Sequence, residues 1–303
     1  MSVARLKIFC FALALSMCFC HGATARNLFV DNTAGDDRAN GREPTSSLES
    51  GPVRTIARAL TLSEPGDHIV LAPTGQPYRE SVSLSGGNHS GFSVRPFTIV
   101  GNGAVLDGSE PVPPKSWEPV RENLYRFRTP RGGYHRLFLD GKPATRVPVD
   151  SAVGRLPSMQ PRQWCSHDGY IYLTTDKDKH PREYPLSYAA LPVGISLYQV
   201  KNVVVLDLTV QGFQTDGVNA HDSARNARLG GMILRGNGRS GLAVGGSSTV
   251  EADGCLIGDN GESQVNLSGY GTLSLQLCDL LDATAPKILR RGGRLFIDGV
   301  MQE

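Results

Sequence analysis

The sequence predicts an all-β fold in which the chain winds into a parallel β-helix, and three observations lead to this prediction. Apolar residues recur every 22 to 24 residues in the second half of the chain. Within each repeat they alternate with period two, as in Val203/Val205 and Leu273/Leu275, which is typical of strands. Glycine is abundant, at 35 of 303 residues, and Gly, Asn, Asp or Ser separate the short strands. We therefore expect coils of three strands, with each strand about 4.8 Å from its counterpart in the next coil.

The repeat places equivalent residues in files that run from coil to coil. These files are Val218, Leu242, Val265 and Ile288; Val210, Leu234, Ile257 and Leu280; and Val203, Ala227, Val250, Leu273 and Leu295. We expect the first file to form an interior column. Asn237 and Asn260 recur in Asn-Gly turns, and their side chains are expected to stack as a ladder that satisfies backbone groups. Cys255 and Cys278 also stack, as a buried thiol pair or, alternatively, as a disulfide.

The first 25 residues have the features of a secretory signal peptide. Arg5 and Lys7 precede an apolar run, residues 8–20, that is too short to span a bilayer. Ala23 and Ala25 then form a cleavage site of the A-x-A kind. No later stretch is long and apolar enough to cross a membrane. We expect cleavage near Ala25 and a protein that is secreted to the periplasm or the extracellular space.

The charge balance of the remaining chain argues against a partner that is held by bulk charge. Without Arg5 and Lys7, 29 basic residues face 29 acidic ones. A nucleic acid or an anionic membrane would require an excess of positive charge. Cys165, Cys255 and Cys278 remain after cleavage, and this odd, low number excludes a disulfide framework.

Residues 26–108 are expected to form an N-terminal cap and the first coils of the β-helix. GPVRTIARAL places Ile56, Ala59 and Leu60 on one helical face, which predicts a short amphipathic capping helix. Such a helix covers the strand edges that a first coil would otherwise leave open.

Residues 109–190 break the repeat and are expected to form a small β module inserted between coils. Prolines at positions 111, 113 and 114 interrupt the pattern. LFLDGKPATRV predicts a hairpin around Asp140-Gly141. Trp117, Tyr125 and Trp164 are candidates for the core of this module. The coils resume near Gly194, so residues 191–303 are expected to complete the β-helix.

Several stretches of the sequence resemble a known family. VDNTAGDDRANG, GPVRTIARAL and PGDHIVLAPTGQPYRES are similar to the N-terminal segment of secreted right-handed parallel β-helix proteins of the pectate-lyase-like superfamily. RLFLDGKPATRVP resembles the β module inserted in some β-helix glycosidases, including β-helix xylosidases. The resemblance covers most of residues 27–300 and implies a right-handed β-helix. Members include polysaccharide lyases, glycoside hydrolases, epimerases and non-catalytic proteins, so the resemblance leaves the reaction open. No evident cap follows the last strand, and family enzymes usually carry more coils, which suggests a shortened member.

Polysaccharide hydrolysis requires two carboxyl groups on one outer face of the coils. A separation of about 5–5.5 Å suits retention of configuration, and roughly 6.5–9.5 Å suits inversion. Asp259 and Asp282 are 23 residues apart, hence on adjacent coils, which fits a retaining pair or a shared Ca²⁺ site. Asp216 and Glu262 would lie two coils apart, with about 10 Å between their backbones, as an inverting pair. For each aspartate the competing interpretation is a turn residue that bonds its own backbone.

Three further residues are candidates for substrate binding, namely Arg239, His221 and Phe213. Arg239 lies one coil before Glu262, so the two side chains could instead form a surface ion pair. Phe213 is the aromatic residue expected on the groove side, and the alternative for His221 is an exposed loop position. QTDGV, which contains Asp216, is similar to the N-T-D motif of polygalacturonases, but the motifs that follow it in that family are missing.

No cofactor is required by these residues, although a structural or catalytic Ca²⁺ stays open. Asp31, Asp36 and Asp37 cluster near the N-terminus and could bind a structural Ca²⁺ or form a solvated loop. No file contains the three or more acidic residues that a strong Ca²⁺ site would require.

Together these features predict a secreted carbohydrate-active protein, a polysaccharide-cleaving glycoside hydrolase in the first interpretation. In the second interpretation it is a polysaccharide lyase, in which a base removes the proton α to a uronate carboxylate while Ca²⁺ or Arg neutralises that carboxylate. In the third it is a non-catalytic protein that binds glycans or supports a surface structure. A hydrolase requires that one of the carboxylate pairs point outward into a single groove.

Overall fold

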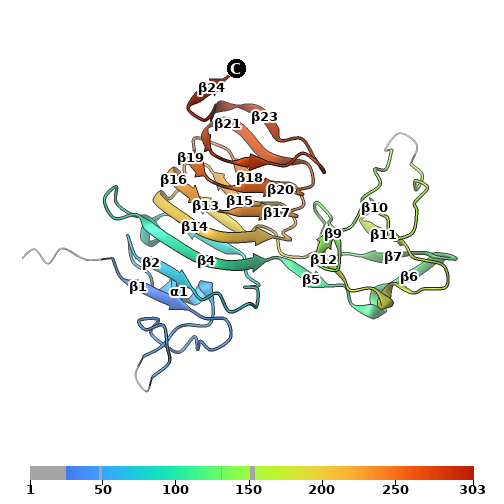
Figure 1. Ribbon diagram of the computed structural model, residues 1–303, viewed down its shortest axis with the longest axis horizontal. Coiled ribbons are helices and arrows are strands. Elements are labelled where there is room, and N and C mark those ends of the chain that lie inside the picture. The colour runs from blue at the N-terminus through green and yellow to red at the C-terminus, as the bar shows by residue number, and fades with distance from the viewer. Residues whose placement is uncertain (1–24, 48–49, 131, 151–153) are drawn as a thin grey trace, which may run out of the picture.

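Parallel strands dominate the computed structural model, which describes residues 25–47, 50–130, 132–150 and 154–303 (Figure 1). The expected signal peptide lies outside these ranges apart from its last residue, Ala25. No helix within the described ranges is long and apolar enough to cross a membrane.

The chain winds into the predicted right-handed parallel β-helix, in which one sheet curls around the long axis of the coils (Figure 1). Its strands are β1 (Asn27–Val30), β2 (His68–Leu71), β3 (Val82–Ser85), β4 (Phe97–Asp107), β13 (Ile195–Tyr198), β14 (Lys201–Gln211), β15 (Asp216–His221), β16 (Arg225–Gly230), β17 (Ile233–Arg235), β18 (Ser240–Val244), β19 (Thr249–Asp253), β20 (Leu256–Gly258), β21 (Ser263–Gln276), β22 (Asp279–Leu280), β23 (Ile288–Ile297) and β24 (Val300–Gln302). Strands on successive coils pair in parallel, and β24 turns back on β23 as an antiparallel hairpin.

The curled sheet has three faces. The first face contains β1, β2, β16 and β19, the first halves of β4 and β14, and the second halves of β21 and β23. The second face contains the second halves of β4 and β14, followed by β17, β20 and β22. The third face contains β3, β13, β15 and β18 and the first halves of β21 and β23.

The observed register confirms the predicted files of apolar residues. Val218 pairs with Leu242, Leu242 with Val265, and Val265 with Ile288. The files that begin at Val203 and Val210 are in register as well. Nearly all of these side chains are buried in one continuous core along the axis. The apolar core runs through every coil, so the hydrophobic effect stabilises each coil and not a single central cluster.

Asn237 and Asn260 form the predicted ladder at the turn between the second and third faces. Both residues are fully buried. The Oδ1 atom of Asn260 accepts a 2.9 Å hydrogen bond from the main-chain nitrogen of Asn237, and the Oδ1 atom of Asn237 accepts a 3.1 Å bond from that of Phe213. The Nδ2 atom of Asn260 also donates to the carbonyl oxygen of Leu234. The side chains therefore satisfy main-chain groups that the turn leaves without strand partners.

The predicted capping helix is α1 (Ile56–Leu62), and it lies beside β1 and β2 (Figure 1). The hydroxyl of Thr55 caps its first turn by accepting a hydrogen bond from the main chain of Arg58. The carboxylate of Glu80 accepts two more bonds, from the main-chain nitrogens of Ile56 and Ala57. Burial raises the pKa of Glu80. Ile56, Ala59 and Leu60 pack into the same core as the coils, as their helical spacing predicts.

Between β4 and β13 the chain leaves the coils and forms two antiparallel sheets of four strands each, which we call the module. Their strands are β5 (Ser109–Pro111), β6 (Glu118–Arg121), β7 (Leu124–Arg128), β8 (Leu137–Leu139), β9 (Lys142–Pro143), β10 (Trp164–His167), β11 (Tyr170–Thr174) and β12 (Leu186–Ala189). Short 3₁₀ helices occur in the module at Pro114–Ser116 and Pro181–Glu183, and another lies in the coils between β3 and β4, at Gly87–His89. Trp117 and Trp164 are buried in a cluster separate from the core of the coils, and Tyr125 packs against it. The module projects from the side of the stacked coils (Figure 1).

Phe213 lies in the turn between β14 and β15, and its ring fills the core beside the points where the module leaves and rejoins the β-helix. A Cβ atom on Gly108 would lie 2.4 Å from this ring, so position 108 must be glycine for the ring to pack. A Cβ atom on Gly194 would lie 2.3 Å from Cγ1 of Val210 and 2.4 Å from the carbonyl oxygen of Gly217, so this position must also be glycine. The expectation that Phe213 lies on the groove side is wrong, because its side chain is 0% exposed and belongs to the interior.

Removal of one ladder residue is expected to destabilise the fold more than removal of a similar residue outside the core. Asn260→Ala leaves the buried main-chain nitrogen of Asn237 without a partner, so we expect a loss of about 1–3 kcal/mol in the free energy of unfolding, measured by urea titration. Asn88→Ala is the control, because Asn88 is exposed and its side chain makes no hydrogen bond to any described residue. We expect a change of about 0.5 kcal/mol or less for this control. Equal losses in the two variants would contradict a structural role for the buried ladder.

Candidate functional site

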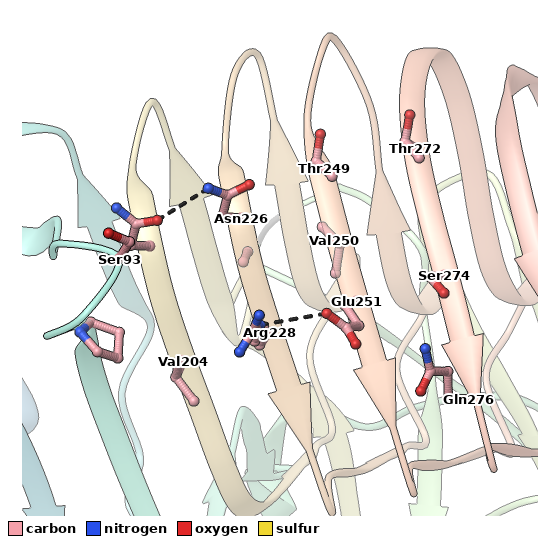
Figure 2. Close-up of a pocket in the computed structure, with 13 residues that line it drawn as sticks. Ser93, Val204, Asn226, Arg228, Thr249, Val250, Glu251, Thr272, Ser274 and Gln276 are labelled. Atoms are coloured by element: carbon pink, nitrogen blue, oxygen red, sulfur yellow. Dashed lines mark hydrogen bonds and ion pairs between the residues drawn. The ribbon is translucent and has the colours of Figure 1, made fainter. Parts of the chain in front are cut away.

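Two grooves on the coils have the size and the polar lining of a ligand site. The sheet groove, about 540 Å³ in volume, lies on the first face across β14, β16, β19 and β21 (Figure 2). It is lined by Ser93, Pro96, Asn202, Val204, Asn226, Ala227, Arg228, Thr249, Val250, Glu251, Thr272, Ser274 and Gln276. The module groove, about 380 Å³, lies where the module meets the second face. It is lined by Asp107, Ser109, Phe138, Gly141, Lys142, Pro143, Ser187, Gln211, Gly212, Arg235, Gly236, Asp259 and Thr284.

The sheet groove is an open surface of side chains repeated from coil to coil. Figure 2 shows Arg228 and Glu251 joined across neighbouring strands, with 3.4 Å between Nε and Oε2. Threonines 249 and 272 present hydroxyl groups in register on the next two coils. Glu251 is the sole carboxylate among the described residues that line this groove. The sheet groove thus offers many hydrogen-bonding groups but not the two acids that glycoside hydrolysis requires.

The floor of the module groove is a chain of hydrogen bonds that runs along three successive coils. Asp107, Gln211 and Arg235 occupy equivalent positions on β4, β14 and β17. The amide of Gln211 donates to Asp107 over 3.1 Å, and its oxygen accepts a 2.9 Å bond from Nε of Arg235. Asp107 also accepts a 2.8 Å bond from the main chain of Ser109, where the chain enters the module. These bonds hold the three side chains side by side at the entry to the module.

Lys142 lies in this groove together with Arg235, and it comes from the hairpin of β8 and β9. Neither side chain forms an ion pair within the described part of the chain. Two cations without carboxylate partners therefore face a groove that also holds Asp107 and Asp259. Such an arrangement favours a polar ligand that carries hydrogen-bond acceptors or a negative charge.

Asp259 lies in the turn after β20 and is half-buried at the module groove. Its backbone has the left-handed conformation, with φ of 58°, and its carboxylate makes no hydrogen bond to any described residue. Its carbonyl oxygen accepts a hydrogen bond from Nη2 of Arg136, a module residue that is 5% exposed. Burial and, to a smaller extent, the neighbouring Arg146 lower the pKa of Arg136 to about 10, while Asp259 acts in the opposite direction. A buried guanidinium of the module therefore fixes the turn that presents the Asp259 carboxylate.

Asp282 follows one coil after Asp259, as the repeat predicts. Ile257 pairs with Leu280, and the main-chain nitrogen of Leu281 donates to the carbonyl oxygen of Ile257 over 3.0 Å. The pairing ends at Leu280, two residues before Asp282, and parallel strands of neighbouring coils lie about 4.8 Å apart. The Asp282 side chain is 71% exposed, with 4.0 Å between its carboxylate and Nζ of Lys287. It does not itself line the module groove, although Thr284 of the same loop does.

Asp107 is too far from Asp259 to act with it as a pair. The two residues are separated by three steps of register, from Asp107 to Gln211, Arg235 and then Gly258. Three steps correspond to about 14 Å between backbones, beyond the separation that suits either retention or inversion. Asp107 therefore belongs to the floor of the groove, and Asp259 with Asp282 is the pair with a suitable spacing.

Asp216 and Glu262, the other expected pair, are not brought together. The Asp216 side chain is 0% exposed and forms an ion pair with Arg239. It also accepts bonds from the hydroxyl of Ser240, at 2.6 Å, and from the amide of Asn219, at 2.9 Å. Glu262 is exposed in the turn before β21. The assignment of Asp216 to an outer groove is thus incorrect, because its inward side chain is fully occupied by protein partners.

Arg239 pairs with Asp216 and not with Glu262. The hydrogen bonds that its guanidinium donates to Asp216 raise the pKa of Arg239, and this guanidinium also lies 5.9 Å from the centre of the Tyr134 ring. His221 lies on the third face, where its ring is 5.0 Å from that of Tyr198 and its Nδ1 is 3.9 Å from Asp222. Neither Arg239 nor His221 lines either groove.

The acidic residues near the N-terminus are engaged with the protein itself. Asp31 accepts hydrogen bonds from Thr33 and from the main chain of Ala34. Asp36 pairs with Arg38, and Asp37 binds the main chain of Thr55. Within the described ranges, no three His, Cys, Asp or Glu side chains converge as a metal site would require.

Asp107, Lys142 and Arg136 were missed by sequence reasoning. Asp107, Gln211 and Arg235 each come directly after an apolar residue of one file, namely Leu106, Val210 and Leu234. An alignment of the coils along this file could have identified Asp107 and Arg235. The insertion separates Asp107 from Gln211 by more than a hundred residues and hides the repeat. Lys142 and Arg136 belong to the module, whose sequence carries no repeat that relates it to the coils.

Comparisons with known proteins agree with this architecture. Residues 193–292 match a family model described as a right handed beta helix region. A solved structure described as a glycoside hydrolase is similar, with a TM-score of 0.58 and 10% identity over 84% of this chain and 73% of that chain. The structure of XylC in complex with xylose has a TM-score of 0.39 and 13% identity, over 89% of this chain and 69% of that chain. The structure of pectate lyase Pel9A has a TM-score of 0.39 and 12% identity, over 84% of this chain and 54% of that chain. A comparison with curated proteins finds no match. The first of these structures shares the fold with this chain.

Loss of the Asp216 carboxylate is expected to destabilise the protein. Asp216→Ala leaves the guanidinium of Arg239, which is 28% exposed, without its counter-ion, so we expect the free energy of unfolding to fall by about 3 kcal/mol. Glu262→Ala is the control and is expected to change it by about 0.5 kcal/mol or less, because its exposed side chain has no partner among the described residues. Urea titration of both variants measures the difference. An unchanged stability of Asp216→Ala would show that the buried ion pair has no structural role.

Proposed function

We propose that the protein is a carbohydrate-active enzyme that hydrolyses a polysaccharide in the module groove, with Asp259 and Asp282 as its two carboxyl groups. The observation that carries this proposal is the position of Asp259. Among the described residues, its carboxylate has no hydrogen-bond partner and the two cations of the groove that it faces, Lys142 and Arg235, have no carboxylate partner. A second acid, Asp282, lies on the next coil. The similar structure described as a glycoside hydrolase supports the same class of activity.

The expected mechanism follows from the spacing of the two acids. A backbone separation of about 4.8 Å suits the closer, retaining arrangement of carboxyl groups. Asp259 suits the nucleophile, because the guanidinium of Arg136 attracts its negative charge. Asp282 would then protonate the leaving oxygen and later activate water. Lys142 and Arg235 would bind hydroxyl groups of the sugar on either side.

A lyase reaction is the second candidate, and the two unpaired cations favour it. Lys142 and Arg235 could neutralise the carboxylate of a uronate unit, which lowers the barrier to removal of the adjacent proton. A non-catalytic glycan-binding protein is the third candidate, favoured by the many hydrogen-bonding groups of the sheet groove. Export from the cell, which the N-terminal residues predict, would place any of these activities where polysaccharides occur.

Activity is expected to depend on the module groove and not on the sheet groove. Residues 26–303 would be incubated with neutral and uronate-containing polysaccharides, with release of reducing ends to detect hydrolysis and ultraviolet absorbance to detect an unsaturated lyase product. Asp259→Asn and Asp282→Asn should each lower hydrolysis by about 100-fold or more, because each removes a group that acts in the transition state. Glu251→Gln, which removes an acid from the sheet groove, should retain activity.

The outcomes separate the three candidates. Full activity in Asp259→Asn together with loss in Glu251→Gln would move the active site to the sheet groove. An ultraviolet-absorbing product would establish a lyase, and binding without turnover would establish a non-catalytic protein.

The first product of hydrolysis is expected to retain the anomeric configuration of the substrate. This follows from the adjacent-coil spacing of Asp259 and Asp282. At this spacing no water molecule fits between the nucleophilic carboxylate and the sugar, so the carboxylate attacks the sugar directly. Proton NMR spectra recorded during the first minutes of reaction would show the configuration before the free sugar equilibrates. Inversion would rule out this pair in the proposed roles.

A further inference from the structure

Cys255 and Cys278 occupy equivalent positions on neighbouring coils, directly before β20 and β22. Leu256 pairs with Asp279, and the main-chain nitrogen of Asp279 donates a 2.9 Å hydrogen bond to the carbonyl oxygen of Cys255. Parallel neighbours in register have backbones about 4.8 Å apart. This spacing lies within the range of about 4.4–6.8 Å between Cα atoms that a disulfide spans.

The two thiols point in the same direction along the axis. Sγ of Cys255 lies 3.6 Å from the carbonyl oxygen of Leu229, and Sγ of Cys278 lies 3.4 Å from that of Ala252. Leu229 and Ala252 are themselves register partners, so each thiol leans toward the coil that precedes its own. The Cys278 sulfur therefore leans toward the coil that carries Cys255.

The surroundings of the two thiols give them different reactivities. Cys255 is 2% exposed, whereas Cys278 is half-buried and within reach of solvent. The neighbouring Cys255 thiol lowers the pKa of Cys278, whereas the interaction with Cys278 together with burial raises the pKa of Cys255. A thiolate is the attacking species in disulfide exchange, so Cys278 is suited to react first.

We propose that Cys255 and Cys278 form a disulfide between coils by exchange with a small-molecule disulfide such as oxidised glutathione. The Cys278 thiolate attacks one sulfur of the oxidant, whose S–S bond breaks and releases one glutathione thiolate. The Cys255 thiol then loses its proton and attacks the Cys278 sulfur of the mixed disulfide, which releases the second glutathione. The protein loses two electrons and two protons, and the oxidant is reduced to two thiols.

This bond would strengthen the weakest part of the second face. β22 has only two residues, and the loop that follows it, residues 281–284, is exposed. Asp259 and Asp282 each follow one of the cysteines by four residues. The disulfide would therefore also fix the two proposed acids relative to each other. That last consequence rests on the proposed function, whereas formation of the bond does not.

Cys165 provides an internal control for the experiment. It lies in the module, is 0% exposed, and packs against Leu124 and Tyr172. Burial raises its pKa to about 11. We expect it to stay a thiol under conditions that oxidise the other two cysteines.

The test uses the folded protein with its three cysteines first reduced. After exposure to oxidised glutathione, remaining thiols are alkylated under denaturing conditions and the protein is digested without reduction. Mass spectrometry should show alkylated Cys165 and a cross-linked peptide that joins Cys255 to Cys278, lighter than the reduced pair by two hydrogens. The oxidised protein should also unfold at a higher temperature, and a reducing agent should reverse this shift.

Single variants separate the two steps. Cys255→Ser should accumulate a mixed disulfide of glutathione on Cys278, because the resolving thiol is absent. Cys278→Ser should leave Cys255 as a thiol in the folded protein. In the reduced protein, the rate of alkylation at Cys278 should rise at a lower pH than that of an ordinary thiol, and Cys255→Ser should move the midpoint upward. Three alkylated cysteines after oxidation, or a stable mixed disulfide on Cys278 in the unchanged protein, would overturn the proposal.

Discussion

Hydrogen bonding between the backbones of successive coils is the constraint on which this structure depends. Each strand pairs with its own counterpart one turn later, so a slip of one residue would carry a whole file of interior side chains to the surface. The Asn237–Asn260 ladder adds a second constraint at the turn between the second and third faces, because its bonds form only when that turn keeps its length. The paired coils that meet these requirements are 22 to 24 residues long.

The same constraint explains where the module stands. It replaces the turn between the second and third faces in the coil that runs from β4 to β13, which is the turn column that Asn237 occupies later in the chain. The ladder ends one coil later, where Asn237 bonds the main chain of Phe213, and the ring of Phe213 packs against Gly108 and Gly194 of the coil that carries the module. An insertion is thus tolerated at the end of the ladder, and the module groove lies beside the turns that the ladder holds in place.

The fold could be predicted because interior packing leaves a regular trace in the sequence, whereas the site could be predicted only in part. The files that contain Val218 and Val203 can be recognised in the sequence from the recurrence of apolar residues every 22 to 24 positions. The adjacent-coil relation of Asp259 and Asp282 is visible for the same reason. Asp216 was misjudged because QTDGV has the composition of a turn, although Asp216 begins β15 and points inward. The buried serines that follow it in register, Ser240 and Ser263, are the signal of an inward polar column.

Arg136 shows how the module and the coils act on one another. A guanidinium that is 5% exposed, with Nε unpartnered among the described residues, is costly to bury, and an apolar side chain of similar volume would pack there at less cost. What an apolar side chain lacks is the donor that binds the carbonyl oxygen of Asp259 and the positive charge beside its carboxylate. The buried guanidinium therefore lowers stability at this junction. Proteins often have lower stability where a side chain is held in place for function. The position of Arg136 therefore supports the proposal that the module groove, with Asp259 in it, is the ligand-binding site.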